Sequence, residues 1–534
     1  MSDGGSLIVK SPTRFWLLIL ALLLISCANC YAKETVQRRK PAAHRTLSMA
    51  AFEGRVRGAW AGQMIGVTYG APTEFRFLGK INEKPRDWKP EELAGALDQD
   101  DLYVEMTFTK VLDTVGLEAT SEQFGEAFKD SKYRLWHANM AARRLLRRGI
   151  KAPLSGDPRY NFHANDIDFQ IESDFIGLMC PGLPRATQRI AARVGHVMNY
   201  GDGVYGGVFI AAMYSAAFFE NDPRKVVQAG LAAIPSASGY ARVIRDVLQW
   251  SAENPDDWKK TWNLIESKYD KHDVCPDGAL MPFNIDASLN GAYVVLGLLY
   301  GNKDFDKTME IAMRSGQDSD CNPSSAAGVL GAMIGYEAIP KKWTGALASI
   351  ADKKFSYTDY SFNSIVASTL TRAKSEIERQ GGSVAENRLV IPIQSPAALK
   401  LEQFLPGPPV ERIGFGDRRW KFEGAWEDTK SDDFEHVKRS QTAGSKATAS
   451  FGGTGAIVYG LIRPDGGLAT VILDGERAGN IAAYYDEGDR TEGIWGKFDL
   501  PPGQHTVQVL IQGKPYPGSK GSWVYVKDLV AYRK

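Results

Sequence analysis

Residues 315–343 read SGQDSDCNPSSAAGVLGAMIGYEAIPKKW, and this stretch decides much of the fold. An acidic loop carrying Asp318 and Asp320 leads into Asn322 and Pro323. Asparagine favours the N-cap position and proline the first helical position, so a helix is predicted to begin here. Small residues then recur at three- and four-residue spacing, which is typical of a helix that packs closely against another backbone.

A second close-packing helix is predicted in FEGRVRGAWAGQMIG (52–66). Glycines recur there at every fourth position: Gly54, Gly58, Gly62 and Gly66. Each glycine costs a helix about 0.8–1 kcal/mol relative to alanine, so such a row indicates a stripe that another backbone approaches. Glu74 follows soon after this helix and offers a carboxylate just beyond its end.

A second acidic loop is Asp98-Gln99-Asp100-Asp101. Adjacent carboxylates repel one another and need solvent, a counter-charge or a cation; the simpler interpretation is a helix N-terminus with acids in its first turn. Asp318 and Asp320, two residues apart, can point the same way on an extended loop and chelate one ion. An EF-hand is excluded, because its sixth and twelfth positions would be Pro323 and Val329.

Charge and cysteine content argue against two further classes, proteins that bind nucleic acid and proteins with a structural zinc site. The 534 residues carry 64 Lys and Arg against 63 Asp and Glu, a net charge of +1. The chain therefore lacks the overall basic charge typical of proteins that bind nucleic acid. Only seven histidines are present, and no CxxC pair follows the N-terminal leader. The sequence accordingly gives no indication of a structural zinc site.

Residues 1–32 are predicted to be an export leader. Two basic residues precede the apolar run 15–25, which is too short for a confident membrane span. Leu24-Ile25-Ser26-Cys27 resembles a bacterial lipobox, in which Cys27 would be lipidated. Ordinary signal cleavage after Ala32 and an uncleaved membrane anchor are the alternatives. We expect a periplasmic or cell-surface lipoprotein, otherwise a secreted protein, with membrane contact only through the lipid anchor.

The rest of the chain divides into a tether, two domains and a linker. We expect a polar tether at 33–48, an all-α domain at 49–387, a proline-rich linker at 388–412 and a β domain at 413–534. Short β-branched runs separated by turn signals predict that the last is an antiparallel β-sandwich, or jelly roll. Its aromatic residues would serve as core or as platforms for sugars: Trp420, Trp426, Tyr484, Tyr485, Trp495 and Trp523.

Four segments, in this order, resemble the ADP-ribosylglycohydrolase family. They are GAWAGQMIGVTYGAPTEF (58–75), DQDDLYVEMTF (98–108), YGDGVYGGVFIAAMYSAAF (200–218) and the opening stretch, 315–343. The last is similar to the family's GGDTDT-helix-G-IP pattern. The resemblance implies an all-α catalytic domain with two magnesium ions. The C-terminal region resembles the galactose-binding-like jelly rolls of bacterial carbohydrate-active enzymes.

The resemblance also implies roles for individual residues. The metal ligands would be Asp100, Asp101, Asp318 and Asp320, with Gln99 able to add an amide oxygen, and Glu74 and Asp101 would act in catalysis. Carboxylates without a histidine cluster favour two divalent cations, Mg²⁺ first and Mn²⁺ or Ca²⁺ next. Gln99, Leu102 and Cys321 stand where the family has threonines, which puts one metal position in doubt.

Two further segments are candidates for substrate binding. Asp168 and Asp174 lie in a stretch that is expected at the rim of the site, although a solvated helix start is the alternative. The loop NYGDGVYGG (199–207), with Gly203, Tyr205 and Gly206, would bind phosphate or sugar through backbone N–H groups, or form a tight turn.

The sequence thus predicts an exported metal-dependent hydrolase of a glycosidic bond. The expected partner is a small molecule or glycan, namely an ADP-ribosyl, riboside or extracellular glycan substrate, with no nucleic acid. The alternative is a non-catalytic surface lipoprotein that binds carbohydrate and has a degenerate metal site.

Overall fold

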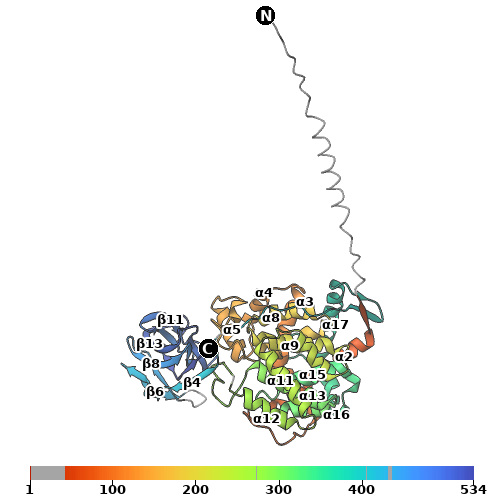
Figure 1. Ribbon diagram of the computed structural model, residues 1–534, viewed down its shortest axis with the longest axis horizontal. Helices are drawn as coiled ribbons and strands as arrows, with labels where there is room; N and C mark the ends of the chain where they lie inside the picture. The colour runs from red at the N-terminus through yellow and green to blue at the C-terminus, as the bar shows by residue number, and fades with distance from the viewer. Residues whose placement is uncertain (2–42, 272, 404–405, 431–435) are drawn as a thin grey trace. The chain divides into compact units, whose positions relative to one another are not determined.

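The computed structural model describes Met1 and residues 43–271, 273–403, 406–430 and 436–534 (Figure 1). The predicted leader, with Cys27, and residues 33–42 of the tether lie outside the described residues. Within the described part of the chain, no helix is long and apolar enough to cross a membrane. Residues 44–534 make up one unit.

The first part of this unit is helical, as predicted. Its helices are α2 (Met49–Gly70), α3 (Asp100–Thr114), α4 (Ser121–Lys129), α5 (His137–Arg147), α6 (Asp168–Ile171), α7 (Asp174–Leu178), α8 (Pro184–Gly195), α9 (Asp202–Ala217), α10 (Pro223–Ala232), α11 (Gly239–Glu253), α12 (Trp258–Tyr269), α13 (Ala287–Gly301), α14 (Phe305–Arg314), α15 (Cys321–Ile334), α16 (Lys341–Thr344) and α17 (Phe362–Arg379). Short 3₁₀ turns connect them: η1 (Ala71–Thr73), η2 (Pro90–Asp98), η3 (Leu154–Gly156), η4 (Tyr336–Ala338) and η5 (Leu347–Ser349). Helices α9, α13 and α15 are buried along almost their whole length, which fits their apolar composition.

The glycine row of α2 packs directly on α15. A Cβ on Gly62 would lie 2.2 Å from the carbonyl oxygen of Ala327, and one on Gly66 would lie 2.2 Å from that of Pro323. Gly58 meets the backbone at the far end of α15 in the same way, whereas a Cβ on Gly54 would meet nothing within 4 Å. The predicted close approach is therefore confirmed for Gly58, Gly62 and Gly66, and it brings the end of α2 next to the beginning of α15.

Helix α15 begins slightly earlier than the sequence predicts. Its first residue is Cys321 and its N-cap is Asp320, not Asn322. The Asn322 side chain instead donates to Asn290 Oδ1 on α13, at 3.0 Å. A contact with another helix has replaced the local cap.

The ends of the helical domain differ from the prediction. Within the predicted tether, β1 (His44–Ser48) pairs with β3 (Arg388–Pro392) from the predicted linker. Strand β2 (Ser383–Val384) completes a three-stranded antiparallel sheet. Leu389 and Ile391 alternate along β3 and are fully buried, so both segments are ordered parts of the domain where tether and linker were expected.

The C-terminal region is an antiparallel β-sandwich, as predicted. Its main sheets have the strand orders β11-β10-β13-β8-β5 and β12-β9-β15-β4, and a small sheet has the order β14-β7-β6. The strands are β4 (Pro409–Gly414), β5 (Trp420–Glu423), β6 (Glu427–Lys430), β7 (His436–Ser440), β8 (Lys446–Gly453), β9 (Gly455–Ile462), β10 (Gly467–Leu473), β11 (Glu476–Ala482), β12 (Arg490–Lys497), β13 (Gly503–Pro515), β14 (Val524–Val526) and β15 (Asp528–Tyr532). Buried residues alternate along β8 and β10, as expected for strands with one face in the core. Of the six candidate aromatic residues, Trp420, Tyr485 and Trp495 are buried and the others are half-buried.

The sandwich makes polar contacts with loops of the helical domain. Tyr532 donates to the carbonyl oxygen of Val274 at 2.9 Å, and Arg412 donates to that of Pro276 at 2.9 Å. Arg143 of α5 donates to Glu487 at 2.5 Å. The loop that follows α12 is therefore held by both domains.

Candidate active site

A cavity of about 600 Å³ lies at the beginnings of α3 and α15. One part of its lining is acidic, formed by Glu74, Asp98, Asp100, Asp318 and Asp320, with the neutral amide of Gln99 among them. Another part is aromatic: Phe75, Tyr103, Trp136, His137 and Phe283. The cavity thus combines a group of carboxylates with flat apolar walls, an arrangement suited to a polar ligand that carries a ring.

Hydrogen bonds hold the segment around Glu74 against the loop that carries Asp318 and Asp320. The N–H of Phe75 donates to the carbonyl oxygen of Gln317 at 3.1 Å, and the N–H of Gln317 donates to that of Phe77 at 3.1 Å. Thr73 and Ser319 share a further hydrogen bond at 2.8 Å. These contacts, added to the packing of α2 on α15, place Glu74 beside the loop that carries Asp318 and Asp320.

Three residues around the cavity have an unusual backbone conformation. Phe75, His137 and Gln317 have φ values of +50°, +43° and +52°. L-residues other than Asn and Asp seldom adopt this left-handed region, and such strain collects at functional sites. The backbone is therefore strained on the acidic side of the cavity and on the aromatic side.

Asp100 and Asp101 occupy the first turn of α3, where the helix dipole favours negative charge. Gln99 is the N-cap, and its side chain makes no capping bond. Asp101 is fully buried and does not line the cavity: it lies beneath Asp100, and its Oδ2 accepts a hydrogen bond from the Cys321 thiol at 3.2 Å. Cys321 therefore connects the two acidic loops.

The electrostatics of the carboxylates favour a bound cation. Loss of hydration, followed by repulsion from Asp101 and Asp100, raises the pKa of Asp320 to about 7. Loss of hydration and the charges of Asp320 and Asp100 raise the pKa of Glu74, at the cavity rim, to about 8. Burial also raises the pKa values of Asp101 and Asp318 well above their usual range.

Unpartnered oxygens support the same interpretation. Among the described residues, none donates a hydrogen bond to Oδ1 of Asp101, Asp318 or Asp320, although all three atoms are buried. Ligand atoms of Asp318, Asp320 and Cys321 lie within 4.8 Å of one another. Buried carboxylates are stable when they are paired or bind a metal, and oxygen donors suit hard cations. The residues present therefore fit a divalent cation centre.

Asp174 lies outside the cavity, although it is a predicted substrate-binding residue. It is buried behind Asp101, where its Oδ2 accepts a hydrogen bond from Tyr214 at 2.6 Å. Glu105, one turn after Asp101, lies in the same region and accepts hydrogen bonds from Gln63 and the N–H of Phe175. Asp174 thus belongs to a buried polar layer that supports the site from behind.

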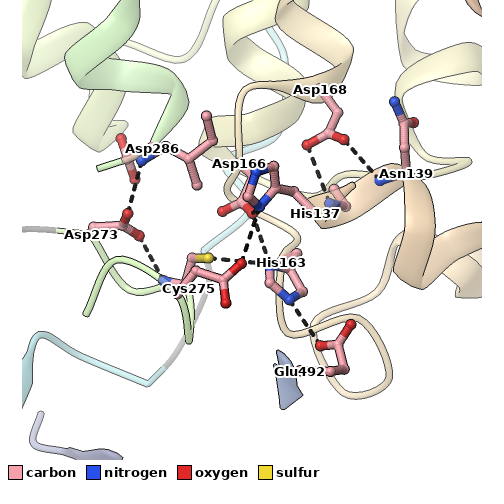
Figure 2. Close-up of polar contacts among 12 residues, drawn as sticks. His137, Asn139, His163, Asp166, Asp168, Asp273, Cys275, Asp286 and Glu492 are labelled. Carbon is pink, nitrogen blue, oxygen red and sulfur yellow. Dashed lines mark hydrogen bonds and ion pairs between the residues drawn. The ribbon is translucent and has the colours of Figure 1, made fainter. Parts of the chain in front are cut away.

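Asp168 lines the cavity, as the sequence suggests, but its oxygens are already engaged. They accept the backbone N–H groups of Ala138 at 3.2 Å and Asn139 at 2.9 Å, at the beginning of α5 (Figure 2). Asp168 therefore fixes this turn, and with it His137, against the cavity. The expected contact with substrate is secondary to this role.

The predicted glycine-rich loop does not contribute to the cavity lining. A Cβ on Gly203 would lie 2.4 Å from the carbonyl oxygen of Ala164, and one on Gly206 would lie 2.7 Å from Gln170 Oε1. Tyr205 donates to the carbonyl oxygen of Lys400. These three residues lie within α9 and pack against neighbouring groups, and none of them lines the carboxylate cavity.

The aromatic wall is what the sequence analysis missed. His137 stacks on Phe283, with ring centroids 5.7 Å apart, and Phe283 also contacts Phe75 at 5.0 Å. These residues come from segments that are far apart in the sequence and carry no common motif. The nearest local signal is Trp136-His137, an aromatic pair directly before a helix.

Comparisons with known proteins agree with this description. The sequence model of the ADP-ribosylglycohydrolase family matches residues 48–373. A solved structure described as an "ADP-ribosylglycohydrolase-related protein complex" is 15% identical, covers 61% of this chain and 99% of its own, and has a TM-score of 0.40. A two-domain esterase active on acetylated mannans is 16% identical over 32% of this chain and 46% of its own, with a TM-score of 0.21.

A third similar structure is the CBM36-1 domain of a multidomain xylanase from the hindgut metagenome of Trinervitermes trinervoides. It is 11% identical over 22% of this chain and 93% of its own, with a TM-score of 0.17. The comparison with curated proteins returned no match. Because the family model spans more than half of the sequence, this chain belongs to the ADP-ribosylglycohydrolase family.

Proposed function

We propose that this protein is an exported, metal-dependent hydrolase of a glycosidic bond. The observation that carries the proposal is the set of buried carboxylates, contributed by the beginnings of α3 and α15, whose Oδ1 atoms accept no hydrogen bond from the described residues. Family membership supports hydrolase chemistry. The proposed substrate is an ADP-ribosyl compound, a riboside or an extracellular glycan.

Asp100, Asp101, Asp318 and Asp320 would hold two divalent cations, Mg²⁺ in preference to Mn²⁺ or Ca²⁺, with Gln99 able to add its amide oxygen. The bound cations would polarise a substrate hydroxyl or water and stabilise developing negative charge. Glu74, with its pKa raised to about 8, can hold a proton near neutral pH. It is therefore suited to donate that proton to a leaving oxygen or to take one from water.

The aromatic wall would bind the ring of the substrate and limit access of water. Tyr103, Trp136 and Phe283 line the cavity together with the carboxylates, and apolar ring faces pack well against sugars and bases. The predicted leader and the β-sandwich favour a substrate outside the cell over an intracellular ADP-ribosylated protein. Sugar binding by the sandwich remains a prediction.

A hydrolysis screen in the presence of magnesium tests the proposed function. The panel would contain ADP-ribosyl conjugates and aryl glycosides, with pentofuranosides included. We expect magnesium-dependent release of product from at least one class. Binding of glycans without hydrolysis of any panel member would instead support the non-catalytic, carbohydrate-binding alternative.

Magnesium affinity is expected to rise with pH between about 5 and 8. In the metal-free protein, the raised pKa values of Asp320 (about 7) and Glu74 (about 8) keep protons on both groups in the folded state at the acid end of this range, and the groups lose them towards its upper end. A cation must displace those protons, so magnesium binds more tightly as the pH rises.

The stability of the metal-free protein should change in the opposite direction. In the unfolded chain both acids have their ordinary, lower pKa values and carry no proton in this range, so the metal-free fold loses stability as the pH rises through the raised pKa values of the folded state. Thermal unfolding with and without magnesium across this range checks both trends; a magnesium shift that shrinks with rising pH would contradict them.

Cys321→Ser is expected to strengthen magnesium binding, by about three- to tenfold, because a hydroxyl oxygen is a harder donor than sulfur. Cys180→Ser is the matched control, since Cys180 is also a buried free cysteine but does not line the cavity. Calorimetric titration with Mg²⁺ measures the effect. Weaker magnesium binding in Cys321→Ser than in the control would show that the thiol does not limit the affinity of the site for magnesium.

A further inference from the structure

His163, Asp166 and Cys275 form a further cluster of metal-ligating side chains (Figure 2). His163 Nδ1 is 2.9 Å from Asp166 Oδ2 and 3.1 Å from Cys275 Sγ. Ligand atoms of all three residues lie within 4.8 Å of one another, and each side chain is at most 1% exposed. None of the three lines the carboxylate cavity.

Hydrogen bonding alone leaves this cluster incompletely satisfied. A ring nitrogen carries at most one proton, yet His163 Nδ1 faces both a carboxylate and a thiol. Asp166 Oδ1 is buried and accepts no hydrogen bond from the described residues. Buried polar atoms of native proteins are nearly always paired, so the unpartnered oxygen calls for an explanation.

The surroundings of the cluster resemble the outer shell of a metal site. His163 Nε2 lies 2.9 Å from Glu492 Oε1 of β12, and a metal-bound imidazole typically donates its other N–H to a carboxylate. Asp273 orients the cysteine, because its Oδ1 accepts the backbone N–H of Cys275 at 2.8 Å and its Oδ2 accepts that of Ile285 at 3.0 Å. The imidazole and the thiol are thus each held in place by a carboxylate.

We propose that His163 Nδ1, the Asp166 carboxylate and Cys275 Sγ bind a zinc ion. Nitrogen, sulfur and carboxylate oxygen together are a donor set typical of zinc and unsuited to magnesium. On binding, the thiol proton and any proton on His163 Nδ1 are released to solvent. His137 Nδ1 lies 3.8 Å from Asp166 Oδ2 and forms an ion pair with Asp277 Oδ2 at 3.2 Å, so it is not counted among the ligands.

The ion would hold together the loop of His163 and Asp166, the loop of Cys275 and, through Glu492, the β-sandwich. Asn165 and Ile167 pair with the 285–287 segment through backbone hydrogen bonds, which join the loop of His163 and Asp166 to the segment that follows Cys275. Glu492 connects these loops to the β-sandwich. His137, which faces Asp166, is part of the aromatic wall. The zinc site would therefore fix the sandwich to the loops behind the cavity, and it does not depend on the proposed hydrolase function.

This proposal reverses an expectation from the sequence. Scarce histidines and the absence of a CxxC pair gave no indication of zinc, because the ligands come from positions 163, 166 and 275. Only the fold brings them together.

Zinc content of the purified protein is the first test. After production in zinc-supplemented medium and dialysis against magnesium, we expect about one zinc ion per chain. Cys275→Ala should lower the zinc content at least about tenfold. Cys180→Ala and Cys321→Ala are matched controls that should keep it, because they remove the other two free cysteines of the described chain. Circular dichroism checks that each variant is folded.

Cobalt substitution keeps the test decisive if Cys275→Ala fails to fold. The wild-type protein reconstituted with Co²⁺ should show a thiolate-to-cobalt charge-transfer band that persists in Cys321→Ala. Glu492→Gln, which leaves all three ligands in place, should weaken zinc binding about 10- to 100-fold. Absence of zinc and of the band in the folded wild-type protein, or loss of the band only in Cys321→Ala, would overturn the proposal.

Discussion

Replacing Asp318 and Asp320 together with asparagine is expected to lower hydrolysis of any substrate found by about 10³-fold or more. The change removes two anionic ligands from a group of carboxylates near which His137 is a positive group. It also removes repulsion in the metal-free state, where the pKa values of both groups are raised. The metal-free variant should therefore be more stable than the wild type, by about 1–3 kcal/mol.

Steady-state kinetics and urea unfolding without metal measure the two effects. Asp202→Asn is the matched control: Asp202 is a largely buried acid at the beginning of α9, burial raises its pKa to about 7, and it lines a different cavity. We expect this control to keep activity within about twofold. Full activity in the double variant would refute the assignment of the site.

Gly62→Ala is expected to destabilise the fold by about 3 kcal/mol, although alanine is the better helix former. Its Cβ would lie 2.2 Å from the carbonyl oxygen of Ala327, and a backbone atom has little room to move. The helices would separate, which would shift Glu74 away from the loop that carries Asp318. Magnesium affinity should fall together with stability.

Gly54→Ala is the matched control on the same helix. A Cβ at position 54 meets nothing within 4 Å, so the gain in helix propensity should raise stability by up to about 1 kcal/mol. Urea unfolding of the two variants gives the comparison. Shifts of the same sign and size would contradict the packing of α2 on α15.

The acidic side of the site could be predicted because its parts are local in sequence. Each acidic loop lies directly before a helix, the helix after Asp318 and Asp320 is rich in small residues, and the glycine spacing of α2 identifies the stripe that packs on α15. Glu74, Asp100, Asp318 and Asp320 accordingly all line one cavity. Only the resemblance to a family indicated that the two acidic loops meet at one site, because the spacing of residues in the sequence does not show it.

Other features depend on tertiary contacts that a single sequence does not reveal. A glycine-rich segment at the beginning of a helix is typical of both ligand binding and close packing. At Gly203 and Gly206 neighbouring atoms leave no room for a Cβ, so these glycines serve close packing. Asp174 and Asp168 are acids of similar local context, yet one pairs with Tyr214 behind the site and the other caps α5. Strand β1 forms because it pairs with β3, which lies more than 300 residues later in the sequence.

Calorimetric titration of Mg²⁺ into the wild-type protein and into the Asp318→Asn, Asp320→Asn variant tests the central claim most directly, because it needs no substrate. The carboxylate centre predicts saturable binding to the wild type and its loss in the double variant, with Asp202→Asn unchanged. Equal binding by the wild type and the double variant, or no binding by the wild type, would contradict it.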